Sequence, residues 1–158
     1  MAAPTAAAPN YPFTAFNFEV DVTLDGSSER LCRAAFAECD GLEVTVEIKT
    51  IREGGNNGVQ HRLSGPCAYG TVTLKRGMTS PFDLWRWLER VQAQPSLRAN
   101  ANVVVLSADR ASKQAVFALR RCVPVKVKAP PLNAKDGMFA IEELQMVYES
   151  LSLRPPGA

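Results

Sequence analysis

The feature that most constrains the fold is an alternation of apolar and polar residues with a period of two, which recurs along much of the chain. Successive side chains of a β-strand point to opposite faces, so this alternation is typical of a strand with one buried face. It is clearest in FNFEVDVTL, where the expected buried face consists of Phe16, Phe18, Val20, Val22 and Leu24. Similar patterns predict strands over residues 43–51, 70–76, 102–109, 114–121 and 123–129. The chain is therefore expected to be mainly β.

One segment, TSPFDLWRWLERVQAQ, departs from this pattern and predicts an α-helix over about residues 80–94. Ser80 is expected to be the N-cap, Pro81 the first helical residue, and Asp83 a favourable charge near the positive helix start. Trp87 falls toward the edge of the apolar stripe. The residues that recur at helical spacing, and are expected to pack on the core, are Leu84, Trp85, Leu88 and Val91.

The last long segment, MFAIEELQMVYESLSL (138–153), allows two readings. Its glutamates favour a helix, whereas the Pro/Gly-rich loop before it and the need to complete a sheet favour strands. The expected architecture is one domain of about seven strands over residues 11–153, with the helix packed on a sheet or barrel end. Residues 1–10 are expected to form a flexible Ala/Pro-rich arm, and residues 154–158 a short tail.

Composition narrows the possible partners. A net charge of +2, with basic residues spread along the chain, is too mild to imply a nucleic-acid or membrane partner by itself. No apolar stretch approaches the roughly 20 residues needed to cross a bilayer, so no membrane anchor is expected. The N-terminus lacks the basic and apolar regions of a signal peptide, which predicts synthesis in the cytosol.

No group of residues has the pattern of a catalytic site. The glycine-rich loop REGGNNGVQHR lacks the lysine and hydroxyl residue of a P-loop, and it joins two expected strands rather than opening a helix. His61 is the only histidine, and nothing suggests a third group that would orient it against Cys67. Glu142 and Glu143 are adjacent, so on a strand they would point to opposite faces. No catalytic residue is therefore expected, and the chain is predicted not to be an enzyme.

Metal binding is equally unsupported. The four cysteines, which contain no C-x-x-C pair, are Cys32, Cys39, Cys67 and Cys122. A structural zinc site usually draws on closely paired ligands. The cysteines are therefore expected to be buried free thiols, and no metal site or cofactor is predicted.

A monomeric small β-barrel that binds a ligand or single-stranded nucleic acid is the competing interpretation. Barrels of this kind stack bases on exposed aromatic side chains beside a positive groove. The residues that would serve are Tyr69, Lys75, Arg76, Lys126 and Lys128. The phenylalanines, however, mostly share parity with aliphatic residues, which assigns them to the core.

Four segments in a fixed order carry a family resemblance: FTAFNFEVDV, CDGLEVTVEIKTIREGGNNGVQHRLSGP, YGTVTLKRGMTSPFDLWRWL and PVKVKAPPLNAKDGMFAIEELQMVYESL. Together they resemble the tail tube protein family of contractile phages, which includes the inner tube proteins of phage-derived contractile injection systems. The resemblance covers Tyr11 to Leu153 and rests on the shared order, because no single motif is specific. It implies two packed antiparallel sheets forming a barrel-like domain with a flanking helix, related to the tube protein of type VI secretion.

The resemblance also implies a function. Six copies would form a ring, and rings would stack into a hollow tube inside a contractile sheath, which drives the tube through a target envelope. The implied partners are copies of the chain itself, the sheath protein, baseplate or tube-initiator proteins, and cargo in the lumen, either DNA or an effector protein. The expected location is the bacterial cytoplasm during assembly, and then a phage tail or an injection particle that is released.

Two sets of site residues follow from the resemblance. The loop expected to contact the next ring is Glu53, Gly54, Gly55, Asn56, Asn57 and Gly58. The polar strand faces expected to line the lumen, with mixed charge, are Thr45, Glu47, Lys49, Thr71, Thr73 and Lys75. The alternatives are an ordinary mobile hairpin loop and strand faces that simply meet bulk solvent.

Overall fold

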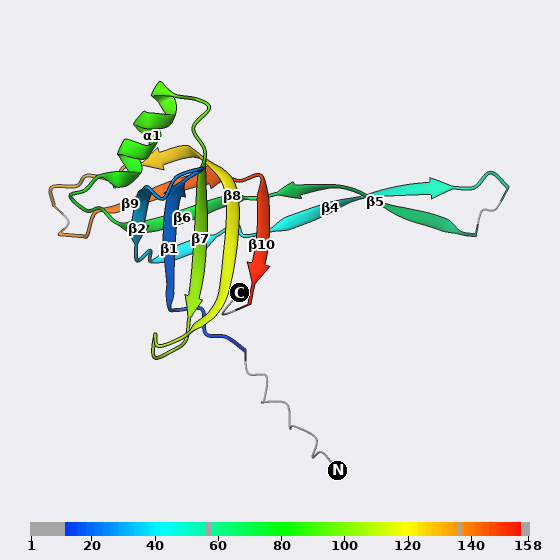
Figure 1. The fold of residues 1–158 in the computed structure, drawn as a ribbon, viewed down its shortest axis with the longest axis horizontal. Coiled ribbons are helices and arrows are strands. Elements are labelled where there is room, and N and C mark those ends of the chain that lie inside the picture. Colours follow the sequence, from blue (N-terminus) through cyan, green and yellow to red (C-terminus); the bar gives the residue numbers. More distant parts are fainter. Residues whose placement is uncertain (1–11, 56–57, 136, 156–158) are drawn as a thin grey trace, which may run out of the picture.

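The computed structural model describes residues 12–55, 58–135 and 137–155. The arm expected over residues 1–10 lies outside them. The described residues form ten strands and one helix (Figure 1), which are β1 (Phe18–Leu24), β2 (Arg30–Ala34), β3 (Glu38–Asp40), β4 (Val44–Arg52), β5 (Gln60–Tyr69), β6 (Thr71–Gly77), α1 (Asp83–Ala93), β7 (Ala99–Leu106), β8 (Lys113–Lys128), β9 (Ile141–Val147) and β10 (Ser150–Arg154).

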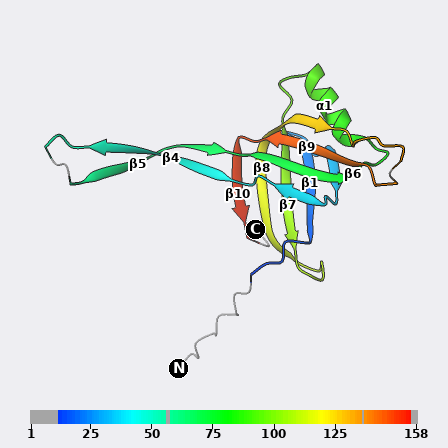
Figure 2. The same ribbon diagram turned by 180° about the vertical axis from the view of Figure 1, so that it is seen from behind.

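The strands form two antiparallel layers that share β8. Sheet 1 consists of β2, β1, β7, the first part of β8, and β10; sheet 2 consists of the second part of β8, then β9, β6 and β3. The strands of the two layers run in crossed directions, and α1 covers one end of the space between them (Figures 1 and 2). This confirms the mainly β fold with two sheets and one helix. Among the described residues the barrel is not closed, because the path of strands ends at β2 and at β3.

β8 connects the layers through a local bend at Arg121. Its first part pairs with β7 as far as Cys122, and its second part pairs with β9 from Val123. At the junction Arg121 has a φ of 55°, and its amide donates to the Asn100 side-chain oxygen at 3.2 Å. The two strands expected over 114–121 and 123–129 are therefore one bent strand, because a bulge turns the chain without ending it.

The core lies between the two sheets and beneath the helix. Val20 and Val22 of sheet 1 and Leu74 of sheet 2 are fully buried. The alternation predicted for residues 16–24 holds from Phe18 onward. It fails at Phe16, which precedes β1 and is 66% exposed.

The helix begins later than expected, and its contact with the core includes Trp87 as well as the predicted Leu84 and Val91. Its N-cap is Phe82, in the left-handed region with a φ of 48°, so Ser80 does not cap it and Pro81 lies outside it. Leu84 is buried as predicted, and the second buried residue of the helix is Trp87, which is 1% exposed. The other residues of the predicted stripe, half-buried in the structure, are Trp85, Leu88 and Val91.

Three strands escaped prediction: β2, β3 and β5. β5 pairs with β4 to form a two-stranded arm that projects from the body (Figure 1). Gly65 and Pro66 interrupt its sequence pattern, and they lie at a bulge opposite Glu47. A bulge is one of the few places where a strand accepts proline, since the missing N–H is not needed there.

The ambiguous C-terminal segment is two strands rather than a helix. β9 completes sheet 2 and β10 completes sheet 1, and the chain passes between them through Tyr148 and Glu149. Glu142 is buried and Glu143 is partly exposed, so the two carboxylates lie on opposite faces of β9, as expected.

Candidate assembly surface

The glycine-rich loop lies at the tip of the arm, the point of the fold farthest from the body (Figure 1). Gly54 and Gly55 form its turn, with a φ of 98° at Gly55, a conformation that favours glycine. The Oε1 atom of Glu53 lies 3.6 Å from the Nε2 atom of His61 on the opposite strand. Asn56 and Asn57, which were assigned to the same contact, lie outside the described residues.

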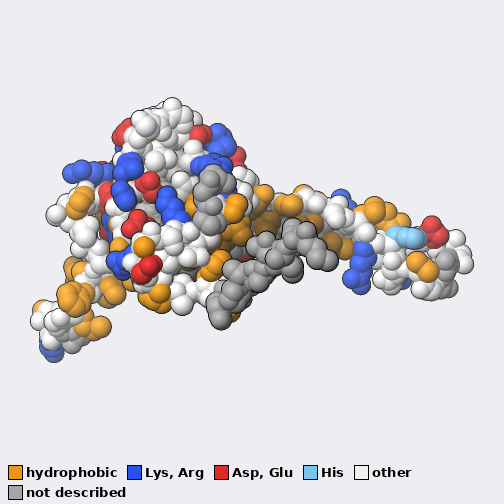
Figure 3. All heavy atoms as spheres, turned by 60° about the horizontal axis from the view of Figure 1, so that its bottom comes forward, with side chains coloured by type: hydrophobic (Ala, Val, Ile, Leu, Met, Phe, Trp, Pro, Cys, Tyr) orange, Lys and Arg blue, Asp and Glu red, His pale blue; other side chains and the backbone are white. Residues whose placement is uncertain are grey.

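The arm has an apolar face with no partner among the described residues. Every residue of β4 is exposed, including Val44, Val46 and Ile48, which project from one side of the ribbon. Hydrophobic side chains are visible along the arm and again at the opposite end of the molecule (Figure 3). That opposite projection is the loop between β8 and β9, where Leu132 and Phe139 are more than nine-tenths exposed. An isolated two-stranded ribbon is marginally stable in water, so this arm is suited to packing against another surface.

The outward face of sheet 2 is polar and carries ordered charges. Cross-strand pairing aligns its side chains in two rows across the four strands. The first row is Lys128, Glu143, Lys75 and Glu38, and the second is Lys126, Gln145, Thr73 and Asp40. The signs alternate along the first row, and the three lysines of the two rows balance the three carboxylates.

Hydrogen bonds within this face are consistent with the alternation of positive and negative side chains. The Lys75 ammonium donates to Glu38 at 2.6 Å, and this hydrogen bond is the main reason that the pKa of Lys75 is raised. The charges of Glu143 and Asp40 act in the same direction. Gln145 donates to Glu143 at 2.9 Å.

Two glycines lie where the arm joins sheet 2, Gly41 between β3 and β4 and Gly70 between β5 and β6. At Gly41, φ is 89°, and an added Cβ would lie 2.0 Å from the carbonyl oxygen of Thr71, so only glycine fits. Gly70 separates β5 from β6 at the same level. Across this irregularity Tyr69 stays on the core side, with its ring 5.6 Å from that of Tyr148. Thr45, which lies on the other side of the ribbon, therefore shares the outward face of Thr71.

The structure thus places Thr71, Thr73 and Lys75 on the polar outward face of sheet 2. Thr45, Glu47 and Lys49 share one side of the arm, but that side also carries Leu63, which pairs with Lys49. Sequence reasoning missed the members of the outward face contributed by β3, β8 and β9, which are Glu38, Asp40, Lys126, Lys128, Glu143 and Gln145. The alternation VPVKVK could have placed Lys126 and Lys128 on one face. β3 has only three residues, too few to show an alternating pattern.

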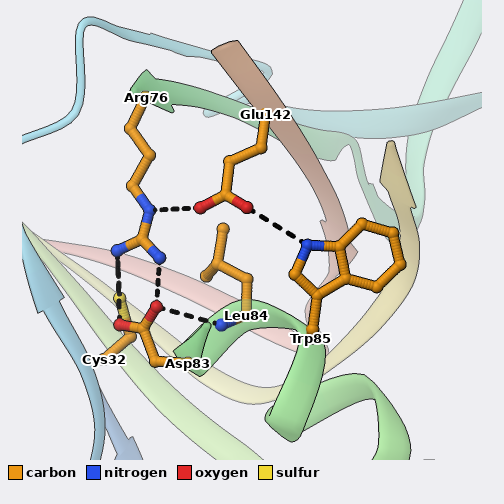
Figure 4. Close-up of polar contacts among 6 residues, drawn as sticks. All are labelled: Cys32, Arg76, Asp83, Leu84, Trp85 and Glu142. Atoms are coloured by element: carbon orange, nitrogen blue, oxygen red, sulfur yellow. Dashed lines mark hydrogen bonds and ion pairs between the residues drawn. The ribbon is translucent and has the colours of Figure 1, made fainter. Parts of the chain in front are cut away.

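The inner face of sheet 2 holds a buried ion network centred on Arg76 (Figure 4). Its Nε atom donates to Glu142 Oε1 at 2.8 Å, and its Nη atoms donate to both oxygens of Asp83. The other oxygen of Glu142 accepts from the Trp85 indole at 3.2 Å. The network ties β6 and β9 to the first turn of α1, and so fixes the helix over the end of the core.

The environment of the network shifts several pKa values. Burial alone would lower the pKa of Arg76, but the hydrogen bonds to Asp83 and Glu142 outweigh burial and raise it. For Asp83 burial acts to raise the pKa, and the hydrogen bond from Arg76 leads the effects that lower it overall. Burial, followed by the hydrogen bond to Asp83, raises the pKa of Cys32 to about 12.

The structure does not assemble the competing nucleic-acid site. Arg76 is 3% exposed and donates to two carboxylates and a thiol, and Tyr69 packs against Tyr148, so neither offers a surface to a base. The cysteines are free; Cys67 is exposed on the arm and Cys39 is only partly buried, which corrects the expectation that all four are buried. Across the described ranges, no three His, Cys, Asp or Glu side chains are placed to hold a metal ion. No helix in this part of the chain has the length and apolarity to span a membrane.

An open pair of sheets with unpaired edges, a projecting apolar ribbon and a polar outer face is typical of a subunit completed by other chains. Comparison with known proteins identifies the class. Residues 14–152 match the family described as T4-like virus tail tube protein gp19. The chain belongs to this family, and it is a structural tube subunit.

Solved structures support the same fold. A chain of the anti-feeding prophage (AFP) baseplate, determined by cryo-EM with six-fold symmetrisation, has a TM-score of 0.80 at 22% identity, covering 92% of this chain and 97% of that chain. A chain of the sheath–tube complex of the extracellular contractile injection system PVC has a TM-score of 0.79 at 16% identity, and the match covers 98% of this chain and 99% of that chain. An Hcp protein has a TM-score of 0.55 at 9% identity, and the match covers 87% of this chain and 98% of that chain. No curated protein sequence matches the chain.

Proposed function

We propose that this tube subunit forms hexameric rings that stack into a hollow tube, with the outward face of sheet 2 lining the lumen. The observation that carries the proposal is the polar, charge-balanced face of a four-stranded sheet whose two edges pair with no other described strand. Six protomers with four strands each, spaced by about 4.8 Å, give a circumference of about 115 Å and a backbone diameter of about 37 Å, and more with strand tilt. Side chains cannot fill such a bore, so its wall has to be hydrophilic.

The arm is then the stacking element. It prolongs the strands of sheet 2 along their own direction, while the loop between β8 and β9 projects from the other end of that sheet (Figures 1 and 2). In a ring closed around sheet 2, the strands run at a tilt to the ring axis, so both projections point toward neighbouring rings. The apolar side chains of the arm would meet Leu132, Met138 and Phe139 of the next ring, which are 92%, 84% and 95% exposed.

The partners follow from this arrangement. The tube would be surrounded by a sheath protein, started by baseplate or tube-initiator proteins, and filled by DNA or an effector protein. The chain would assemble in the bacterial cytoplasm and leave the cell in a phage tail or an injection particle. It would act mechanically, with no enzymatic role. The sheath–tube and baseplate assemblies of the related structures are the basis for these partners.

Insertion of two residues between Gly54 and Gly55 tests the assembly. Because the insertion lengthens only the tip of the arm, the variant is expected to form rings but no tubes when mixed with its initiator proteins. Negative-stain microscopy and sedimentation would measure both species. The control is the same insertion between Ala111 and Ser112, in the turn joining β7 to β8, which should leave tubes intact. Long tubes from the arm variant would show that the stacking assignment is wrong.

A further inference from the structure

Sheet 2 has two open edges of different kinds. One is the second part of β8, from Val123 to Lys128: on one side it pairs with β9, and no described strand pairs with its other side. The other is β3, which pairs only with β6 among the described strands. Unpaired edges of this kind invite another strand, so each edge is a candidate contact with a second copy of the chain.

The strand order makes the two edges compatible. All pairs within sheet 2 are antiparallel, and an even number of strands separates one open edge from the other. β3 therefore runs opposite to β8. When copies are repeated around an axis, β8 of one protomer meets β3 of the next in an antiparallel pair, the same arrangement as inside the protomer.

The charges on the two edges are opposite. On the outward face, the β8 edge carries Lys126 and Lys128, and the β3 edge carries Glu38 and Asp40; all four are exposed. In register with the rows inside the protomer, Lys128 would face Glu38 and Lys126 would face Asp40. A register offset of two residues in either direction still leaves one lysine opposite one carboxylate. Opposite charges directly across a strand pair stabilise it, and like charges destabilise it.

We propose that the ring is closed by a charged seam, in which Lys126 and Lys128 of one protomer face Glu38 and Asp40 of the next. This inference rests on the proposed ring and names the contact that holds it together. The seam continues the alternation of signs from one protomer into the next around the lumen. It also selects one partner, since an edge carrying only lysines or only carboxylates repels a second copy of itself.

Charge reversal tests the seam through two complementary variants. K126E/K128E makes both edges acidic, and E38K/D40K makes both edges basic, so rings of either variant alone would join like charges at every seam. Ring yield is expected to fall at least about tenfold for each. In an equimolar mixture, alternating protomers restore an opposite pair at every seam, and the yield is expected to return to within about twofold of the wild type. The matched control is K113E, the same change at the start of β8 in sheet 1.

Circular dichroism would establish that each variant is folded. A zero-length cross-link tests the seam in the wild-type protein. Within one chain, Lys126 and Lys128 lie three strand spacings, or about 14 Å, from Glu38 and Asp40, too far for direct coupling. Carbodiimide treatment of rings assembled from ¹⁴N- and ¹⁵N-labelled chains should therefore give mixed-isotope peptides joining these residues.

Rings that form equally well from each variant, or a mixture that stays unassembled although both variants are folded, would overturn the seam and leave the tube function standing. The absence of cross-links between these residues in intact wild-type rings would also overturn it. A wild-type chain that forms no rings with its initiator proteins would instead overturn the proposed assembly, and the seam with it.

Discussion

The buried network around Arg76 makes a quantitative prediction about stability. Arg76 is 3% exposed and Glu142 is 1% exposed, and Arg76 is the cation that faces both Glu142 and Asp83. Arg76→Met removes that cation and leaves two carboxylates at the edge of an apolar core. Removing one partner of a buried ion pair typically costs about 3–5 kcal/mol, a large share of the roughly 5–15 kcal/mol that stabilises a domain. With a urea m-value of about 2 kcal/mol per molar, the unfolding midpoint should fall by about 2 M.

The second half of the prediction separates charge from packing. Arg76→Met combined with Glu142→Leu removes both fully buried charges while keeping apolar volume, which is often neutral. We expect the double variant to recover most of the loss, with a coupling free energy of about 2–3 kcal/mol. Urea unfolding followed by tryptophan fluorescence and circular dichroism, at concentrations where the chain is monomeric, would measure both. The control is Lys75→Met, the adjacent residue on the outward face, which should leave the midpoint almost unchanged. A single variant that costs less than about 1 kcal/mol, or a double variant no more stable than the single, would refute the reasoning.

Acid and backbone geometry give two more predictions. The pKa of Asp83 is lowered in the folded state, so its contribution to the free energy of unfolding is present above about pH 4 and is lost as the pH falls through the folded pKa. Unfolding free energies measured from pH 6 to pH 2 should therefore fall less steeply in Asp83→Asn than in the wild type. An unchanged slope would contradict this. Gly41→Ala should lower the unfolding free energy by at least about 2 kcal/mol, because the methyl group meets the Thr71 carbonyl. Gly26→Ala is the control: φ is also positive there but the space is open, so thermal unfolding should show a loss of only about 1 kcal/mol, and equal losses would be the contrary result.

Local patterns predicted the strands whose one face is buried. The alternation of β1 and β6 identified their buried residues because each strand contacts the core along its whole length. β5 was missed because Gly65 and Pro66 break its pattern, and because no core lies beneath the arm to impose one. β8 was divided at Arg121 for the same kind of reason, since a sequence pattern cannot distinguish a bulge from the end of a strand.

The polar outward face of sheet 2 could be predicted only in part. Parity along β6 placed Thr71, Thr73 and Lys75 on one face without knowledge of their neighbours. Which charges lie beside them depends on strand pairing between segments far apart in the chain, such as those of Glu38 and Lys75, which are 37 positions apart. The burial of Arg76 depends on pairing in the same way. Parity puts Arg76 on the face of Val72 and Leu74, but the carboxylate of Glu142 that allows an arginine to be buried there lies 66 positions further along the chain.

The two edges of sheet 2 explain how an open-edged protein can avoid indiscriminate aggregation. Charged residues at a sheet edge usually block pairing with any other strand. Here the proposed seam has one sign on the β8 edge and the other on the β3 edge, so that each edge rejects its own kind and accepts only its complement. A contact between two different surfaces of the same chain is heterologous, and it builds either a closed ring or an open filament, depending on the rotation between successive copies. A ring is therefore obtained only if the curvature of sheet 2 brings the last β8 edge back to the first β3 edge. In the proposed ring, the charges would select which edges meet, and the twist of the sheet would set how many protomers are needed to close it.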